Sequence, residues 1–108
     1  MSPVPATYLN RRELAPGITV HVLATSSTMM QCWVAMSKGT ELPVHSHPHS
    51  QSSYVIKGHM RWLIDGQPVD GPAGSAVIFA PNQPHGALVL SDCEVADTFT
   101  PPRDEYLR

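Results

Sequence analysis

The 108-residue sequence has no block of basic residues, and its nine acidic and seven basic side chains give a formal net charge of −2. Surfaces that bind nucleic acid normally show a stripe of lysine and arginine, so we expect no nucleic-acid partner. No hydrophobic run approaches the roughly 20 residues that span a membrane, so no membrane partner is expected either. Residues 1–8 lack a charged start followed by an apolar stretch, which predicts no secretory signal and a cytoplasmic location.

Cysteine and uninterrupted helical patterns are also scarce. Cys32 and Cys93 are far apart and form no Cys-x-x-Cys motif, so we interpret them as small core residues rather than a disulfide or a nucleophile. Eleven prolines and seven glycines interrupt every window in which a long helical period could form. The pattern therefore predicts one all-β domain of short strands.

The expected strands follow one another at hairpin spacing. They cover residues 18–23, 29–36, 42–47, 51–57, 59–65, 75–79, 86–90 and 94–100. Gly58 and Ser91-Asp92 are predicted to reverse the chain, Asp65-Gly66 to form a tight hairpin turn, and residues 75–79 to form a short buried strand. Residues 1–16 are expected to form an N-terminal arm and residues 17–108 the barrel. Within the arm, residues 8–14 could be an edge strand or a helical turn, and residues 103–108 are expected to form one helical turn.

Three of the six histidines, His45, His47 and His49, alternate within five residues, and Gln51 continues the alternation. Histidine is the commonest protein ligand of transition metals. Because residues two apart in a strand share a face, His45 and His47 could present two imidazoles to one ion. The alternative is that these are surface strand residues without a metal. An isolated histidine, His21, is interpreted as an ordinary strand residue rather than a ligand.

The spacing around these histidines resembles the two motifs of the cupin family. The first is Gly39, five residues, His45-Ser46-His47, three residues, Gln51, six residues and Gly58, with Gln51 where the family usually has glutamate. The second is Gly74 followed by Pro81-Asn82-Gln83-Pro84-His85. The resemblance implies a single-domain jelly-roll β-barrel. It also implies one divalent transition metal ion (Zn, Ni, Mn or Fe) held by His45, His47, Gln51 and His85, with His49 outside the ligand set.

Four neutral ligands would leave the ion its full positive charge and provide no carboxylate base at the metal. The proton carrier of an acid–base reaction must then come from elsewhere. Asp97 shares the predicted inward face of the last strand with Val95 and Phe99, where burial would raise its pKa. Arg103 could fold over the mouth of the barrel and bind a carboxylate. An outward-facing Asp97 and a solvated Arg103 remain the alternatives.

Residues 97–107, together with the first motif, resemble a narrower group, the small cupins of pectin and alginate breakdown. That resemblance implies ring opening of an unsaturated monouronate to a linear keto-deoxyuronate. Asp97 would be the acid–base residue, Arg103 the carboxylate clamp and Phe99 a pocket wall. One departure is Ser50, where a glutamate often precedes the glutamine. Another is a bulky interior that includes Met60 and Trp62, which we expect to line the substrate pocket.

Two other functions remain open at this point. The same ligands could serve a metal-dependent dioxygenase, or the protein could be a non-catalytic cupin that binds a metal or a sugar. The expected partner of the ring-opening enzyme is a small acidic substrate, and that of the dioxygenase is a small oxygenated substrate. Many cupins are dimers, so the resemblance also implies a homodimer.

Overall fold

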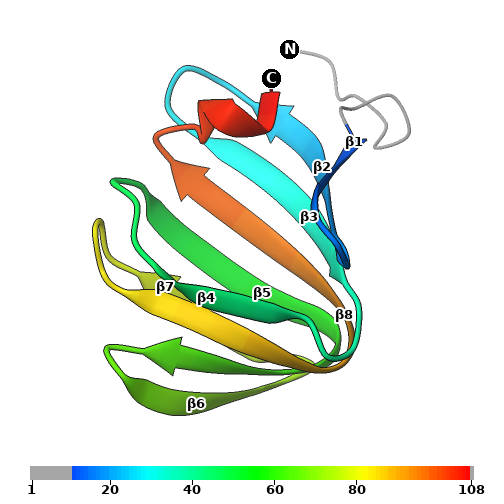
Figure 1. Ribbon diagram of the computed structural model, residues 1–108. Coiled ribbons are helices and arrows are strands. Elements are labelled where there is room, and N and C mark those ends of the chain that lie inside the picture. The colour runs from blue at the N-terminus through cyan, green and yellow to red at the C-terminus, as the bar shows by residue number, and fades with distance from the viewer. Residues whose placement is uncertain (1–10, 108) are drawn as a thin grey trace.

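The computed structural model describes residues 11–107, which form a β-barrel of eight strands and a short 3-10 helix (Figure 1). The elements are β1 (Arg11–Ala15), β2 (Ile18–Thr25), β3 (Met30–Met36), β4 (Glu41–His45), β5 (Ser50–Ile64), β6 (Gln67–Pro72), β7 (Ala76–Phe79), β8 (His85–Thr100) and η2 (Asp104–Leu107). The all-β jelly-roll class predicted from the sequence is therefore confirmed. Among these residues, no helix is long and apolar enough to span a membrane.

Two long strands, β5 and β8, hold the barrel together. The sheet order is β1-β2-β3-β8-β5-β6, with β4 paired to β8 and β7 paired to β5. The first half of β8 pairs with β4 and the second half pairs with β3, while β5 accompanies β8 along almost its whole length. Figure 1 shows both strands bending at the right-hand side of the view. At this bend, each passes between the part of the sheet that contains β3 and the part that contains β4.

The core follows the two-residue period of the strands. On β3, Met30, Cys32, Val34 and Met36 are buried, whereas Gln31 is exposed and Trp33 and Ala35 are partly exposed. This alternation directs one face of the strand into the barrel. Both cysteines are free and buried, as expected. Burial raises the pKa of Cys32 to about 12, so its thiol stays protonated and unreactive at neutral pH.

The prediction that Gly58 starts a return strand is wrong, and so is the prediction of a turn at Ser91-Asp92. Each lies inside one continuous strand, β5 or β8, and the two positions face each other at the common bend. The register shifts on both sides of Gly58, which has a φ of 90°. A Cβ atom there would lie 2.2 Å from the carbonyl oxygen of Asp92. Glycine is required because the two strands approach closely, rather than because the chain forms a hairpin.

Replacing Gly58 with alanine should therefore destabilise the fold by about 3 kcal/mol or more, because positive φ and a backbone clash act together. Gly74 provides a matched control, since its φ is 91° and a Cβ atom would meet nothing within 4 Å. Gly74→Ala should show the backbone strain alone, about 1–2 kcal/mol. Urea unfolding of both variants measures the difference. If Gly58→Ala is no less stable than Gly74→Ala, close approach does not explain this glycine.

Other local predictions had mixed outcomes. Asp65 and Gly66 both have positive φ, 50° and 80°, which confirms the tight hairpin turn. The C-terminal helical turn is confirmed as η2. The strand at residues 75–79 was expected to be buried, but its exposure alternates: Phe79 is buried on the inward face of β7, whereas Ile78 on the outward face is 78% exposed. Of the predicted arm, residues 1–10 lie outside the described residues, and β1 is an edge strand paired with β2.

Candidate metal centre

Three histidines meet at one end of the barrel although His85 is far from the other two in the sequence. His45 is the last residue of β4, His85 is the first residue of β8, and the two are register partners. His47 follows in the loop, and one ring nitrogen from each histidine lies within 4.8 Å of the others. The strand predicted over residues 42–47 ends at His45, so His47 reaches the cluster from a loop rather than by strand alternation.

Backbone carbonyl groups fix the rings of His45 and His85. The Nδ1 atom of His45 lies 2.8 Å from the carbonyl oxygen of Pro43, and the Nδ1 atom of His85 lies 2.8 Å from that of Gln83. A carbonyl oxygen can only accept, so Nδ1 carries the hydrogen in both rings. The Nε2 lone pairs are therefore free to bind an ion, which is the usual arrangement behind metal-ligating histidines.

Gln51, near the start of β5, completes the polar end of the cavity. Its Oε1 atom is 2.9 Å from Nε2 of His47, and its Nε2 atom donates to Oγ of Ser53 at 3.0 Å. The amide oxygen thus lies beside the histidine cluster, and the amide nitrogen points away from it. Nδ1 of His47 is buried and has no hydrogen-bond partner.

His47 and His85 are held in the neutral form that metals bind. Burial lowers the pKa of His47 to about 4, and the positive charge of Arg103 contributes to this shift. Burial also lowers the pKa of His85, and the carbonyl of Gln83 opposes that shift only in part. A lowered pKa reduces the competition of protons with an ion for the rings of His47 and His85. The three histidines fit a single metal ion, which His45, His47 and His85 could hold together.

A cavity of about 300 Å³ extends from this cluster into the barrel. Asp97 of β8 faces it, as the alternation with Val95 and Phe99 predicted, and accepts a hydrogen bond of 2.5 Å from Ser53. Burial raises the pKa of Asp97 to about 6, although hydrogen bonds from Ser53 and Gln51 and the charge of Arg103 act in the opposite direction. Such a carboxyl group can both accept and release a proton near neutral pH.

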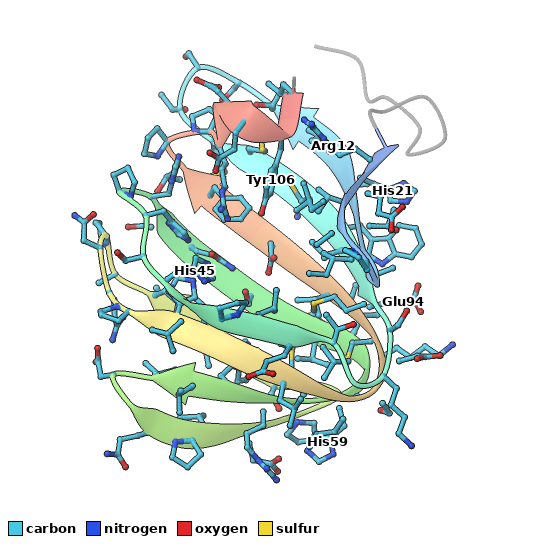
Figure 2. The ribbon with its side chains drawn as sticks, viewed as in Figure 1. Arg12, His21, His45, His59, Glu94 and Tyr106 are labelled. Carbon is cyan, nitrogen blue, oxygen red and sulfur yellow. The ribbon has the colours of Figure 1, made fainter. Side chains whose placement is uncertain are left out.

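Arg103 lies at the same cavity, just before η2. Its guanidinium carbon is 4.6 Å from the centre of the Tyr106 ring and 5.5 Å from that of Phe99. Its Nε atom pairs with Glu105, and Nη1 of Arg12 on β1 donates to the carbonyl oxygen of Glu105 at 2.7 Å. Figure 2 shows the side chain of Tyr106 pointing from η2 toward the interior of the barrel, where it lines the cavity. Contacts with β1 and with the aromatic rings thus hold the C-terminal segment over the barrel.

The structure brings nearly all the predicted site residues to one cavity. Its lining includes His45, Gln51, Met60, Trp62, His85, Asp97 and Arg103. Phe99 and His47 are not among the lining residues, since Phe99 is fully buried and its ring centre lies 6.0 Å from that of His47. His49 is outside the histidine cluster, as expected, and packs against Phe99. His21 contacts Trp33 at the outer surface on the right of Figure 2, also as expected.

Sequence reasoning did not identify Ser53 or Tyr106 as part of the site. Ser53 shares the inward face of β5 with Gln51 and is only 3% exposed. A small polar residue two positions after a predicted ligand, on an inward face, was a usable signal. Tyr106 gave no such signal, because its position depends on how the C-terminal segment folds back over the barrel.

The family model of the cupin domain matches residues 32–99, which is more than half of the chain, and the chain belongs to this family. Fold and site together define a small cupin with a histidine cluster that could hold one metal ion. Among curated proteins, it is 32% identical over 97 residues to the pectin degradation protein KdgF of Dickeya dadantii (strain 3937), covering 88% of each chain. The predicted relationship to the cupins of pectin breakdown is thereby confirmed.

Two solved structures are similar over nearly the whole chain. KdgF from Halomonas sp. superposes with a TM-score of 0.87 at 27% identity, covering 95% of this chain and 94% of that one. An RmlC-like cupin from Shewanella frigidimarina NCIMB 400 has a TM-score of 0.91 at 27% identity, with 98% and 96% covered. These similarities support the relationship at the level of the fold.

Proposed function

We propose that the protein is a metal-dependent enzyme that converts a 4,5-unsaturated monouronate to the linear 5-keto-4-deoxyuronate. The observation that supports this most directly is that Asp97, a half-buried carboxyl group with a raised pKa, faces the same cavity as His45, His85 and Arg103. The relationship to a pectin degradation protein supports this substrate class. The reaction is an isomerisation, so it requires no oxidant, reductant or second substrate.

In this proposal, Gln51 joins His45, His47 and His85 as the fourth ligand of a divalent transition ion. Zn, Ni, Mn and Fe all suit such a set of nitrogen and oxygen donors. A bound ion would supply Lewis-acid polarisation of the substrate oxygens, and its charge would not be reduced by any of the four neutral ligands. Oε1 of Gln51 accepts a hydrogen bond of 2.9 Å from Nε2 of His47. An ion bound by both atoms would replace that hydrogen.

Asp97 moves the proton. It takes the proton from the anomeric hydroxyl as the bond between C1 and the ring oxygen breaks, which leaves an aldehyde at C1 and an enolate at the former ring oxygen. The protonated Asp97 then returns this proton to C4, and the enolate becomes the ketone. A carboxyl pKa of about 6 allows both halves of this transfer near neutral pH. Net proton uptake is zero.

Arg103 binds the substrate carboxylate. Its planar guanidinium group can donate two parallel hydrogen bonds, and the rings of Phe99 and Tyr106 restrict its position. Glu105 now occupies its Nε donor, so the substrate carboxylate replaces that partner or uses the remaining donors. Met60 and Trp62 form part of the apolar wall, which keeps bulk water away from the reacting atoms.

The metal-loaded protein should convert an unsaturated galacturonate faster than buffer does, because the reaction removes the conjugated double bond and its ultraviolet absorbance. Chelation should stop the conversion, and added metal should restore it. The assay is run in air and under anaerobic conditions with an oxygen electrode. Oxygen uptake would instead indicate a dioxygenase. Uronate binding without conversion would indicate a non-catalytic cupin.

A further inference from the structure

Ser53 lies between a proposed metal ligand and the proposed proton carrier. Its hydroxyl donates to Oδ1 of Asp97 at 2.5 Å and accepts from Nε2 of Gln51 at 3.0 Å. Ser53 is only 3% exposed, so solvent has little access to replace either hydrogen bond. Gln51, Ser53 and Asp97 therefore form one continuous hydrogen-bonded chain that begins beside the histidine cluster.

The directions of these hydrogen bonds follow from counting hydrogens. A serine hydroxyl has one hydrogen, and a carboxylate oxygen can only accept it. Oγ of Ser53 must then accept a hydrogen from Gln51, so the NH₂ group of the amide faces Ser53. The amide oxygen is left on the opposite side, beside His47. In the flipped orientation, two oxygen acceptors would face each other without a hydrogen between them, and the NH₂ group would face the histidines.

The strand register holds this chain of side chains in place. Ser53 on β5 is the register partner of Asp97 on β8, and Gln51 is the partner of Phe99. On the other side of β5, Ser53 is paired with Val77 of β7. Because β5 is a central strand at this point, its backbone cannot shift without breaking both pairings. Ser53 is therefore presented to Gln51 and Asp97 by a rigid element.

We propose that Ser53 is a positioning residue. It holds the Gln51 amide with its oxygen toward the metal, and it holds the Asp97 carboxylate toward the cavity. The role of Ser53 in holding the Gln51 amide rests on the proposed ligation by Gln51. This role predicts that Ser53 affects metal affinity through Gln51, although Ser53 itself is not a ligand.

The test measures Zn²⁺ affinity by competition with a chromogenic chelator for wild type, Ser53→Ala, Gln51→Ala and the double variant. Ser53→Ala should weaken binding about tenfold, in the range found when residues that orient metal ligands are removed. The double variant should bind no more weakly than Gln51→Ala, because the effect of Ser53 requires the amide. The visible spectrum of the Co²⁺-loaded protein should change in Ser53→Ala, since the ligand geometry changes.

Val55→Ala is the control for a purely structural effect. Val55 lies two residues further on the same inward face of β5, is fully buried and does not line the cavity. It should lower the melting temperature at least as much as Ser53→Ala does, while leaving Zn²⁺ affinity unchanged.

Two results would overturn the role of Ser53 alone. One is unchanged affinity in Ser53→Ala when Gln51→Ala binds weakly. The other is a full additional loss in the double variant, which would mean that Ser53 does not act through the amide. If Gln51→Ala binds Zn²⁺ as tightly as wild type, the ligation by Gln51 fails, and the positioning role falls with it. None of these readouts depends on uronate turnover, so the proposed reaction is judged separately.

Discussion

Replacing Asp97 with asparagine should lower the turnover of an unsaturated monouronate by about 100- to 10,000-fold, the usual contribution of a general acid–base residue. Asparagine has nearly the same shape, and its oxygen can still accept the hydrogen bond that Ser53 donates. It cannot, however, take up and return a proton near neutral pH. Turnover is measured by loss of ultraviolet absorbance on the metal-loaded variant, after its metal content has been shown to equal that of wild type.

Asp70→Asn is the matched control for this substitution. Asp70 on β6 is exposed and is paired with His59 at 2.5 Å, away from the cavity. Figure 2 shows His59 on the outer surface at the bottom of the barrel. Asp70→Asn should leave turnover unchanged. If Asp97→Asn keeps more than about a tenth of the wild-type rate, which is above the usual range for such a residue, the proton carrier must be another group.

Replacing His85 with alanine should weaken Zn²⁺ binding by more than about 100-fold. Residues that only support metal ligands already contribute about 10- to 100-fold, and His85 would be a ligand itself. His85 presents a fixed Nε2 lone pair to the cluster, since Nδ1 is held by the carbonyl of Gln83. Competition with a chelator measures the change. Because the His85 ring also stacks on Phe79 at 4.2 Å, the fold of the variant is checked by circular dichroism.

The His49→Ala variant tests whether a histidine that lies close to the cluster also binds the ion. The His49 ring centre is 5.2 Å from that of His47, yet His49 is not part of the group that could hold an ion. Its substitution should leave Zn²⁺ affinity within about threefold of wild type, well below the loss expected even for a residue that supports a ligand. If His49→Ala lost as much Zn²⁺ affinity as His85→Ala, the ion would be bound by a set of histidines that includes His49.

Much of the site could be predicted from the resemblance of two motifs to those of the cupins and from strand alternation. The resemblance implied a ligand set of His45, His47, Gln51 and His85 before any geometry was known. The inward direction of Asp97 followed from its alternation with Val95 and Phe99, since a strand has a period of two. His47 joins the cluster as predicted, but it does so from the loop after β4 rather than by alternation within a strand.

Sequence patterns gave wrong predictions where the conformation of a residue depends on its contact with a strand that is distant in the sequence. Gly58 and Ser91-Asp92 have the composition of turns, and nothing local distinguishes a hairpin from a bend within a long strand. The difference arises because Gly58 packs against the backbone of Asp92, which makes both strands continuous through the corner. Ile78 was expected to be buried because its strand is apolar, but it lies on the outward face of β7, and an apolar run does not show which of its faces is covered.

The sequence by itself determined the all-β class, the hairpin at Asp65-Gly66, and the set of side chains at the candidate metal centre. The first two depend on strand alternation and turn chemistry, which are local, and the third depends on the resemblance of two separate motifs to those of the cupins. Only the tertiary structure decided which way the Gln51 amide faces, which nitrogen of His45 and His85 is free, and how far the pKa of Asp97 is raised. Each of these depends on a partner or on burial supplied by the folded chain. Ser53 and Asp97, for example, are 44 residues apart and meet only because β5 pairs with β8.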